Sequence, residues 1–125
     1  MMSDKEPQQL SYYNLDGLIK MSDGDNDFVI EILQTVVDNC FKAVSTIDLH
    51  FLEHDMKALS FFFHKFKSTV HVLGNNGLTK LIGDLELLTK QEESVQEAVY
   101  RDIANLKAAI AILTNKISLE ISKLK

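Results

Sequence analysis

His64 and Lys67 stand one helical turn apart in the segment HKFKSTVHVLG, residues 64–74, whose apolar residues have helical spacing. A neutral histidine ring carries a nucleophilic nitrogen, and a lysine ammonium one turn away can meet the negative charge of a phosphoryl group. The small hydroxyl side chains of Ser68 and Thr69 leave room for a second protein to approach. Residue types in this pattern would suit a histidine that accepts and releases a phosphoryl group.

The direction in which His64 points follows from the rotation of the helix. Successive residues turn by about 100°, so the apolar residues from Leu59 to Leu73 centre roughly 150° away from His64. We therefore expect His64 on the outer side of its helix, within a polar surface on which a partner protein could dock. The residues expected on that surface are Lys57, Ser60, Lys67, Ser68 and His71, with Phe61 close by.

His71 is the second candidate for a reactive histidine, because it lies on nearly the same face two turns further along. Gly74, and not a lysine, stands three residues after it. We expect His71 to be exposed and auxiliary at most.

A metal site is the main alternative chemistry in the sequence. HFLEH at 50–54 fits the H-x-x-E-H pattern of some zinc peptidases, in which two histidines four residues apart on a helix bind one metal. A catalytic site needs a third ligand, and no further copy of the pattern follows. Cys40 is the only cysteine, which excludes an internal disulfide and a cysteine-based zinc site. We expect its thiol to be buried, and we expect no metal or cofactor in this chain.

The composition limits the classes of partner. The chain has 125 residues, as expected for one domain, and a formal net charge of −5, whereas nucleic-acid binders are more often basic. No apolar run approaches the roughly 20 residues that span a bilayer, and the first residues lack the apolar core of a signal peptide. We expect a cytoplasmic protein that binds neither nucleic acid nor membrane.

Apolar residues recur at helical spacing along most of the chain, and no long stretch alternates as a strand does. The sequence predicts a flexible tail over residues 1–12 and one domain over 13–125. This domain is an all-α, antiparallel four-helix bundle with an additional short N-terminal helix that Asn14 caps. The expected apolar faces are Val29, Ile32, Val36, Cys40, Val44, Ile47 and Phe51 in the first long helix; Leu59, Phe62, Phe63, Phe66, Val70 and Leu73 in the second; Leu78, Leu81, Ile82, Leu85 and Leu88 in the third; and Val95, Val99, Ile103, Leu106, Ile110, Leu113, Ile117 and Ile121 in the last.

The expected boundaries between these helices carry turn and capping residues. SDGD at 22–25 is a predicted turn whose aspartates favour a helix start, and a break is expected around EHD at 53–55. GNNG at 74–77 should end one helix and start the next, since glycine and asparagine tolerate the left-handed conformation at a helix end. SVQE at 94–97 is a predicted capping box, in which Ser94 and Glu97 satisfy each other's backbone donors.

Together these features resemble the histidine-containing phosphotransfer (HPt) domains of multistep two-component relays. The family signature is histidine, any residue, an apolar residue, lysine and small residues, with glycine ten positions after the histidine; His64, Lys67 and Gly74 occupy those places. GDLELL at 83–88 puts Glu86 twenty-two residues after His64, which also matches. The chain departs from the pattern at Ser68, where glycine is common, and at Phe63, where alanine is common and where we expect the edge of the core.

The resemblance implies a phosphocarrier. His64 would accept a phosphoryl group from the aspartate of a receiver domain and pass it to another receiver, with Lys67 stabilising the charge of the group and Ser68 as a small neighbour. The implied partners are response-regulator receiver domains and a hybrid sensor histidine kinase, with magnesium only in the receiver and this chain as a monomer. The sequence has no P-loop or glycine-rich nucleotide motif, so we expect no autokinase activity and a transfer intermediate rather than a true enzyme.

The position of Glu86 gives a geometric prediction. His64 lies about eleven residues before the centre of the GNNG turn and Glu86 about eleven after it, so antiparallel helices would bring them to the same height. A carboxylate there could accept a hydrogen bond from Nδ1–H and leave Nε2 free for attack. Two alternatives stay open: a solvated surface glutamate, and a helical adaptor that binds partners without any chemistry.

Overall fold

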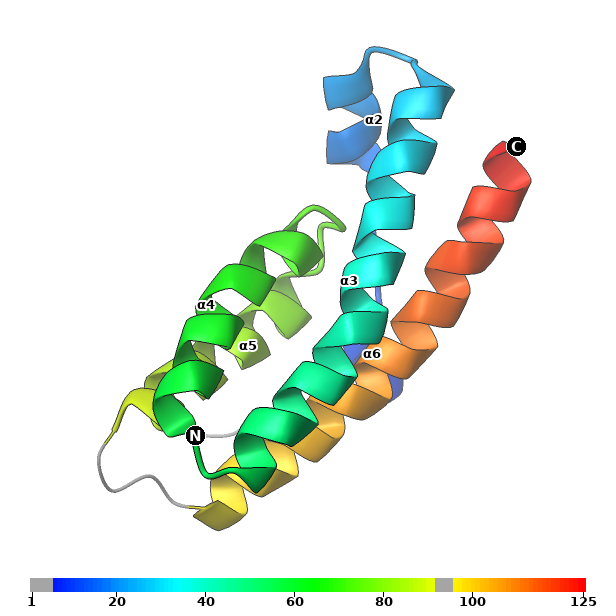
Figure 1. Cartoon of the computed structure of the whole chain (residues 1–125). Helices are drawn as coiled ribbons and strands as arrows, with labels where there is room; N and C mark the ends of the chain where they lie inside the picture. The colour runs from blue at the N-terminus through cyan, green and yellow to red at the C-terminus, as the bar shows by residue number, and fades with distance from the viewer. Residues whose placement is uncertain (1–5, 92–95) are drawn as a thin grey trace.

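The computed structural model describes residues 6–91 and 96–125, and the regular secondary structure in these two ranges is entirely helical (Figure 1). The prediction of an all-α chain is confirmed for this part of the sequence. The predicted capping box depends on Ser94, which lies outside the described residues, as does Val95. The helices are α1 (Pro7–Leu10), α2 (Asp16–Ser22), α3 (Asn26–Leu52), α4 (Met56–His71), α5 (Asn76–Lys90) and α6 (Gln96–Leu124).

The four long helices pack into a helical bundle. α3 packs along α6, α4 packs on both α3 and α5, and α5 also packs on α6 (Figure 1). α3 and α6 extend beyond the turn that joins α4 to α5, and α2 packs on the projecting part of α3. No described helix has the length and apolar character that a bilayer span requires.

The core contains most of the predicted apolar residues of the long helices. Phe62 in α4 and Leu88 in α5 are only partly buried, and the buried face of α3 differs more widely from the predicted one. Ile32, Val44 and Phe51 are only partly buried, whereas Leu33 and Val37 are buried. Leu33 and Phe51 are eighteen residues apart, which is five full turns, so they lie at the same angle around α3 and their different burial depends on the position along the helix. The buried residues of α3 are Val29, Leu33, Val36, Val37, Cys40, Ala43 and Ile47.

Three of the long helices begin at side chains that cap them. Asp25, Asp55 and Asn75 each accept a hydrogen bond from the backbone N–H three residues later, at 3.2, 3.0 and 2.8 Å. These residues lie within the predicted breaks at 22–25, 53–55 and 74–77, so the three boundaries are confirmed.

Residues 6–12, the described part of the predicted flexible tail, are packed against the bundle. α1 packs on α6, and the side chain of Leu10 at its end is fully buried. Asn75 donates to the backbone carbonyl of Leu10, and Lys116 to that of Ser11. A four-residue helix is too short to show a periodic pattern, so these long-range contacts left no signal in the sequence.

Candidate functional site

His64 lies on the outer side of α4, with 65% of its side chain exposed. The predicted orientation of this histidine is therefore confirmed. Phe63, which we expected at the edge of the core, is completely buried. The backbone at this point of α4 is thus held by a large core side chain while the next residue faces solvent.

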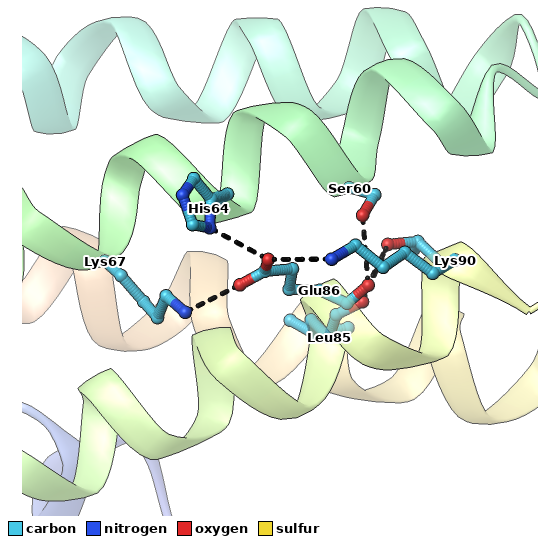
Figure 2. Close-up of polar contacts among 7 residues, drawn as sticks. Ser60, His64, Lys67, Leu85, Glu86 and Lys90 are labelled. Carbon is cyan, nitrogen blue, oxygen red and sulfur yellow. Dashed lines mark hydrogen bonds and ion pairs between the residues drawn. The ribbon is translucent and has the colours of Figure 1, made fainter.

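Glu86 reaches His64 from the neighbouring helix. Its Oε2 lies 2.9 Å from Nδ1 of His64 (Figure 2). α5 returns along α4 after a short turn, which places residues equally distant from that turn side by side, and the predicted contact is present. A carboxylate accepts hydrogen bonds, so this contact favours the tautomer with the proton on Nδ1 and the lone pair on Nε2.

The carboxylate of Glu86 also binds two lysines. Nζ of Lys67 lies 2.7 Å from Oε1, and Nζ of Lys90 lies 3.3 Å from Oε2. Figure 2 shows the two ammonium groups approaching Glu86 from opposite sides. Sequence analysis missed Lys90, although a lysine four residues after a glutamate on a helix is a known pairing pattern that could have revealed it.

Two buried carboxyl groups show what these cations do. Asp102 is 1% exposed, and burial raises its pKa. Glu86 is 5% exposed, yet its pKa is lowered to about 2, first by the hydrogen bond from Lys67 and, against the opposing effect of burial, by those from His64 and Lys90. The cations therefore keep Glu86 ionised in a place where burial alone would favour the neutral acid.

Ser60 does not lie on the outer surface where the sequence placed it. Its side chain is buried, and its hydroxyl donates to the backbone carbonyl of Glu86 at 3.1 Å. By helical rotation Ser60 and Lys67 lie on the edge of α4 next to Phe63, and α5 packs against this edge. The short serine is covered by α5, whereas the longer Lys67 keeps 33% of its side chain exposed.

The other predicted docking residues are exposed, namely Lys57, Phe61, Ser68 and His71. Phe61 is 65% exposed, and Nζ of Lys65 lies 5.1 Å from the centroid of its ring. A groove of about 700 Å³ runs beside His64 and is lined by Lys57, Phe61 and Lys90 among others. His71 faces a different hollow, beside α2, so the structure does not bring it together with Glu86.

The alternative zinc motif is not arranged as a helical pair of ligands. α3 ends at Leu52, and His54 follows in the turn with a φ of 56°. Among the described residues, no three or more histidine, cysteine, aspartate or glutamate side chains are grouped so that they could hold a metal ion. Cys40 is buried, as predicted, and burial raises the pKa of its thiol to about 11.

Comparisons with known proteins add no relative. No protein-family model matches the chain, and neither a curated protein nor a solved structure matches it.

Proposed function

We propose that this protein is a histidine phosphotransfer protein of the HPt type, which carries a phosphoryl group between receiver domains. The observation that carries the proposal is the pairing of an exposed histidine with a buried, ionised carboxylate at Nδ1, which leaves Nε2 open to solvent. In this proposal the four long helices form the antiparallel four-helix bundle of that family. The chain acts as a cytoplasmic monomer.

The transfer step uses the lone pair of Nε2. This nitrogen attacks the phosphorus of an aspartyl phosphate in a receiver domain, so that an N–P bond forms while the bond from phosphorus to the aspartyl oxygen breaks. The electron pair of the broken bond leaves with the aspartate as a carboxylate. Nδ1–H stays hydrogen-bonded to Glu86, which stabilises the positive charge that develops on the ring. The reverse step returns the group to the aspartate of a second receiver.

The lysines around His64 suit a negatively charged phosphoryl group and an acidic receiver domain. The ammonium of Lys67, one turn from His64, is placed to move from Glu86 to the negatively charged phosphoryl oxygens. Lys57 and Lys90 line the adjoining groove, and Phe61 offers an exposed aromatic surface. A receiver's active site is rich in carboxylates, so this positive surface on a chain of net charge −5 would favour its approach.

The proposal assigns no cofactor to this chain. The magnesium ion that assists the transfer belongs to the acidic pocket of the receiver. ATP would enter the relay at the hybrid sensor kinase, so the protein itself would have no autokinase activity.

The test is transfer from a panel of phosphorylated receiver domains. We expect acid-labile phosphate to appear on the parent protein and on His71→Gln, which is the matched control. His64→Gln should remain unlabelled while its helical circular dichroism is unchanged. Labelling of His64→Gln, or loss of label in His71→Gln alone, would show that His64 is not the phosphorylated histidine. Absence of transfer from every receiver would favour the helical adaptor.

A further inference from the structure

Lys67 has two anionic partners in the proposed function, the carboxylate of Glu86 and the phosphoryl group on His64. In the structure its ammonium is 2.7 Å from Oε1 of Glu86, and this contact is the largest cause of the low pKa of Glu86. A phosphoryl group on Nε2 of His64 would present oxygens with up to two negative charges to the same ammonium. If Lys67 turns to the phosphoryl group, Glu86 loses its closest cation while a second anion arrives nearby.

A carboxylate in this position cannot be left without a cation at low cost. Its side chain is 7% exposed, and a buried charge that loses its partner is strongly destabilised. Like charges placed close together in a poorly solvated site also repel strongly. The site therefore needs a second cation on Glu86 that stays in place when Lys67 moves.

Lys90 has the position that this role requires. It is one helical turn beyond Glu86 on α5 and approaches Oε2 from the side opposite to Lys67 (Figure 2). Its side chain is 60% exposed, so holding it there demands little burial of its own charge. We propose that Lys90 is a positioning residue that offsets the charge of Glu86 while Lys67 turns to the phosphoryl group on His64.

This inference rests on the proposed function, but it can be measured without any receiver domain. Phosphoramidate supplies a phosphoryl group directly: Nε2 of His64 attacks phosphorus, the P–N bond breaks, and ammonia leaves with the electron pair of that bond. The rate of N–P bond formation on the whole chain is followed by phosphorus NMR. Lys90→Met removes the charge, and Lys90→Arg keeps it.

The matched control is Lys80→Met. Lys80 pairs with Asp84 at 3.0 Å on the same helix, also across four residues, whereas the carboxylate of Glu86 is bound by His64, Lys67 and Lys90. We expect Lys90→Met to slow labelling about threefold to fivefold, the size of an exposed ion pair. Lys80→Met should label at the parent rate, and Lys90→Arg should restore most of the rate that Lys90→Met loses.

A double-mutant cycle separates the proposed role from direct contact between Lys90 and the phosphoryl group. Glu86→Gln removes the negative charge that Lys90 offsets, so adding Lys90→Met to Glu86→Gln should cause no further loss. An equal slowing in both backgrounds would show that Lys90 acts on the phosphoryl group itself, and an unchanged rate in the native background would show no role; either result overturns the proposal.

A second readout uses the unphosphorylated protein. The ring nitrogen resonances of His64 report the strength of the hydrogen bond to Glu86, so they should shift in Lys90→Met and stay in place when the same change is made in Glu86→Gln. Unshifted resonances in Lys90→Met would overturn the inference. If phosphoramidate labels His64 but no receiver transfers its phosphoryl group, the proposed relay is refuted. The labelling rates of the Lys90 variants then still test the role of Lys90.

Discussion

At His64 the protein holds one ring nitrogen and leaves the other to solvent. Glu86 contacts Nδ1 at 2.9 Å, and the ring as a whole stays largely exposed. A carboxylate that orients a histidine must remain ionised, because the neutral acid is a weaker acceptor and could donate a proton instead. The low pKa of Glu86 is therefore a condition for the proposed chemistry as well as a property of the fold.

Glu86→Gln should reveal this low pKa in the pH dependence of stability. The pKa of Glu86 is lowered from 4.5 to about 2 on folding, so between these pH values the unfolded chain binds more protons than the folded chain. The resulting stabilisation is complete above pH 4.5 and is lost as the pH falls through about 2. We expect the parent to exceed Glu86→Gln in unfolding free energy at neutral pH, and this advantage to shrink with acidification, in urea titrations at several pH values. An advantage that stays constant down to pH 2 would contradict the shift.

The sequence predicted only part of this site, because helical rotation shows which side of a helix a residue faces but not which neighbour covers it. It located the exposed His64 and, through the turn at 74–77, the contact with Glu86. Rotation assigns residues to an inner or an outer side, but it does not say which edge of α4 the neighbouring helix covers. Ser60 was misplaced for this reason, and the role of Lys67 as a partner of Glu86 was missed.

At the scale of the elements, the turn between α4 and α5 packs closely against the segment before α2. Gly74 has a φ of 66°, and the backbone N–H of Asn14 donates to the carbonyl of Leu73 at 2.7 Å. The turn is thus closed by the segment before α2, and it fixes how α5 returns along α4. The glycine and asparagine composition predicted this boundary, whereas nothing in the sequence indicated that Asn14 packs against it.

Gly74→Ala should destabilise the fold through both effects. A Cβ atom on Gly74 would lie 2.7 Å from the carbonyl oxygen of Asn14, and the left-handed backbone disfavours a side chain. We expect the unfolding free energy to fall by about 1–3 kcal/mol, measured by urea denaturation.

Gly17→Ala is the control for that substitution. A Cβ atom there meets nothing within 4 Å, and Gly17 lies inside α2, where alanine is the better helix former by about 0.5–1 kcal/mol. Gly17→Ala should therefore be neutral or stabilising. A similar loss of stability in both variants would mean that the turn at Gly74 has no special requirement.

At the scale of the whole molecule, α1 packs the N-terminal segment against α6, the last helix of the chain. Leu10 is fully buried, α1 packs on α6, and Asn75 at the start of α5 donates to the carbonyl of Leu10. The domain boundary at residue 12 that the sequence predicted therefore cuts through a packed region. Only long-range contacts define this region, and a pattern of neighbouring residues cannot report them.

Leu10→Ala tests whether this segment belongs to the folded unit. Truncating a fully buried leucine should lower the unfolding free energy by about 2–5 kcal/mol, even though Leu10 lies near the chain terminus. Gln8→Ala, at an exposed position in the same helix, should change it by less than about 0.5 kcal/mol. If thermal or urea unfolding finds both variants as stable as the parent, α1 does not contribute to the cooperative fold.

The buried hydroxyl of Ser60 has a consequence for the timing of events at the site. It joins α4 to the backbone of Glu86 itself, so the two helices cannot slide past each other without breaking a buried hydrogen bond. The entropic cost of aligning His64 with the carboxylate of Glu86 therefore falls on folding and would not fall on partner binding. In the proposed transfer, Ser60 would thus hold His64 and Glu86 in register, and the freedom that remains at the site would belong to the lysine side chains.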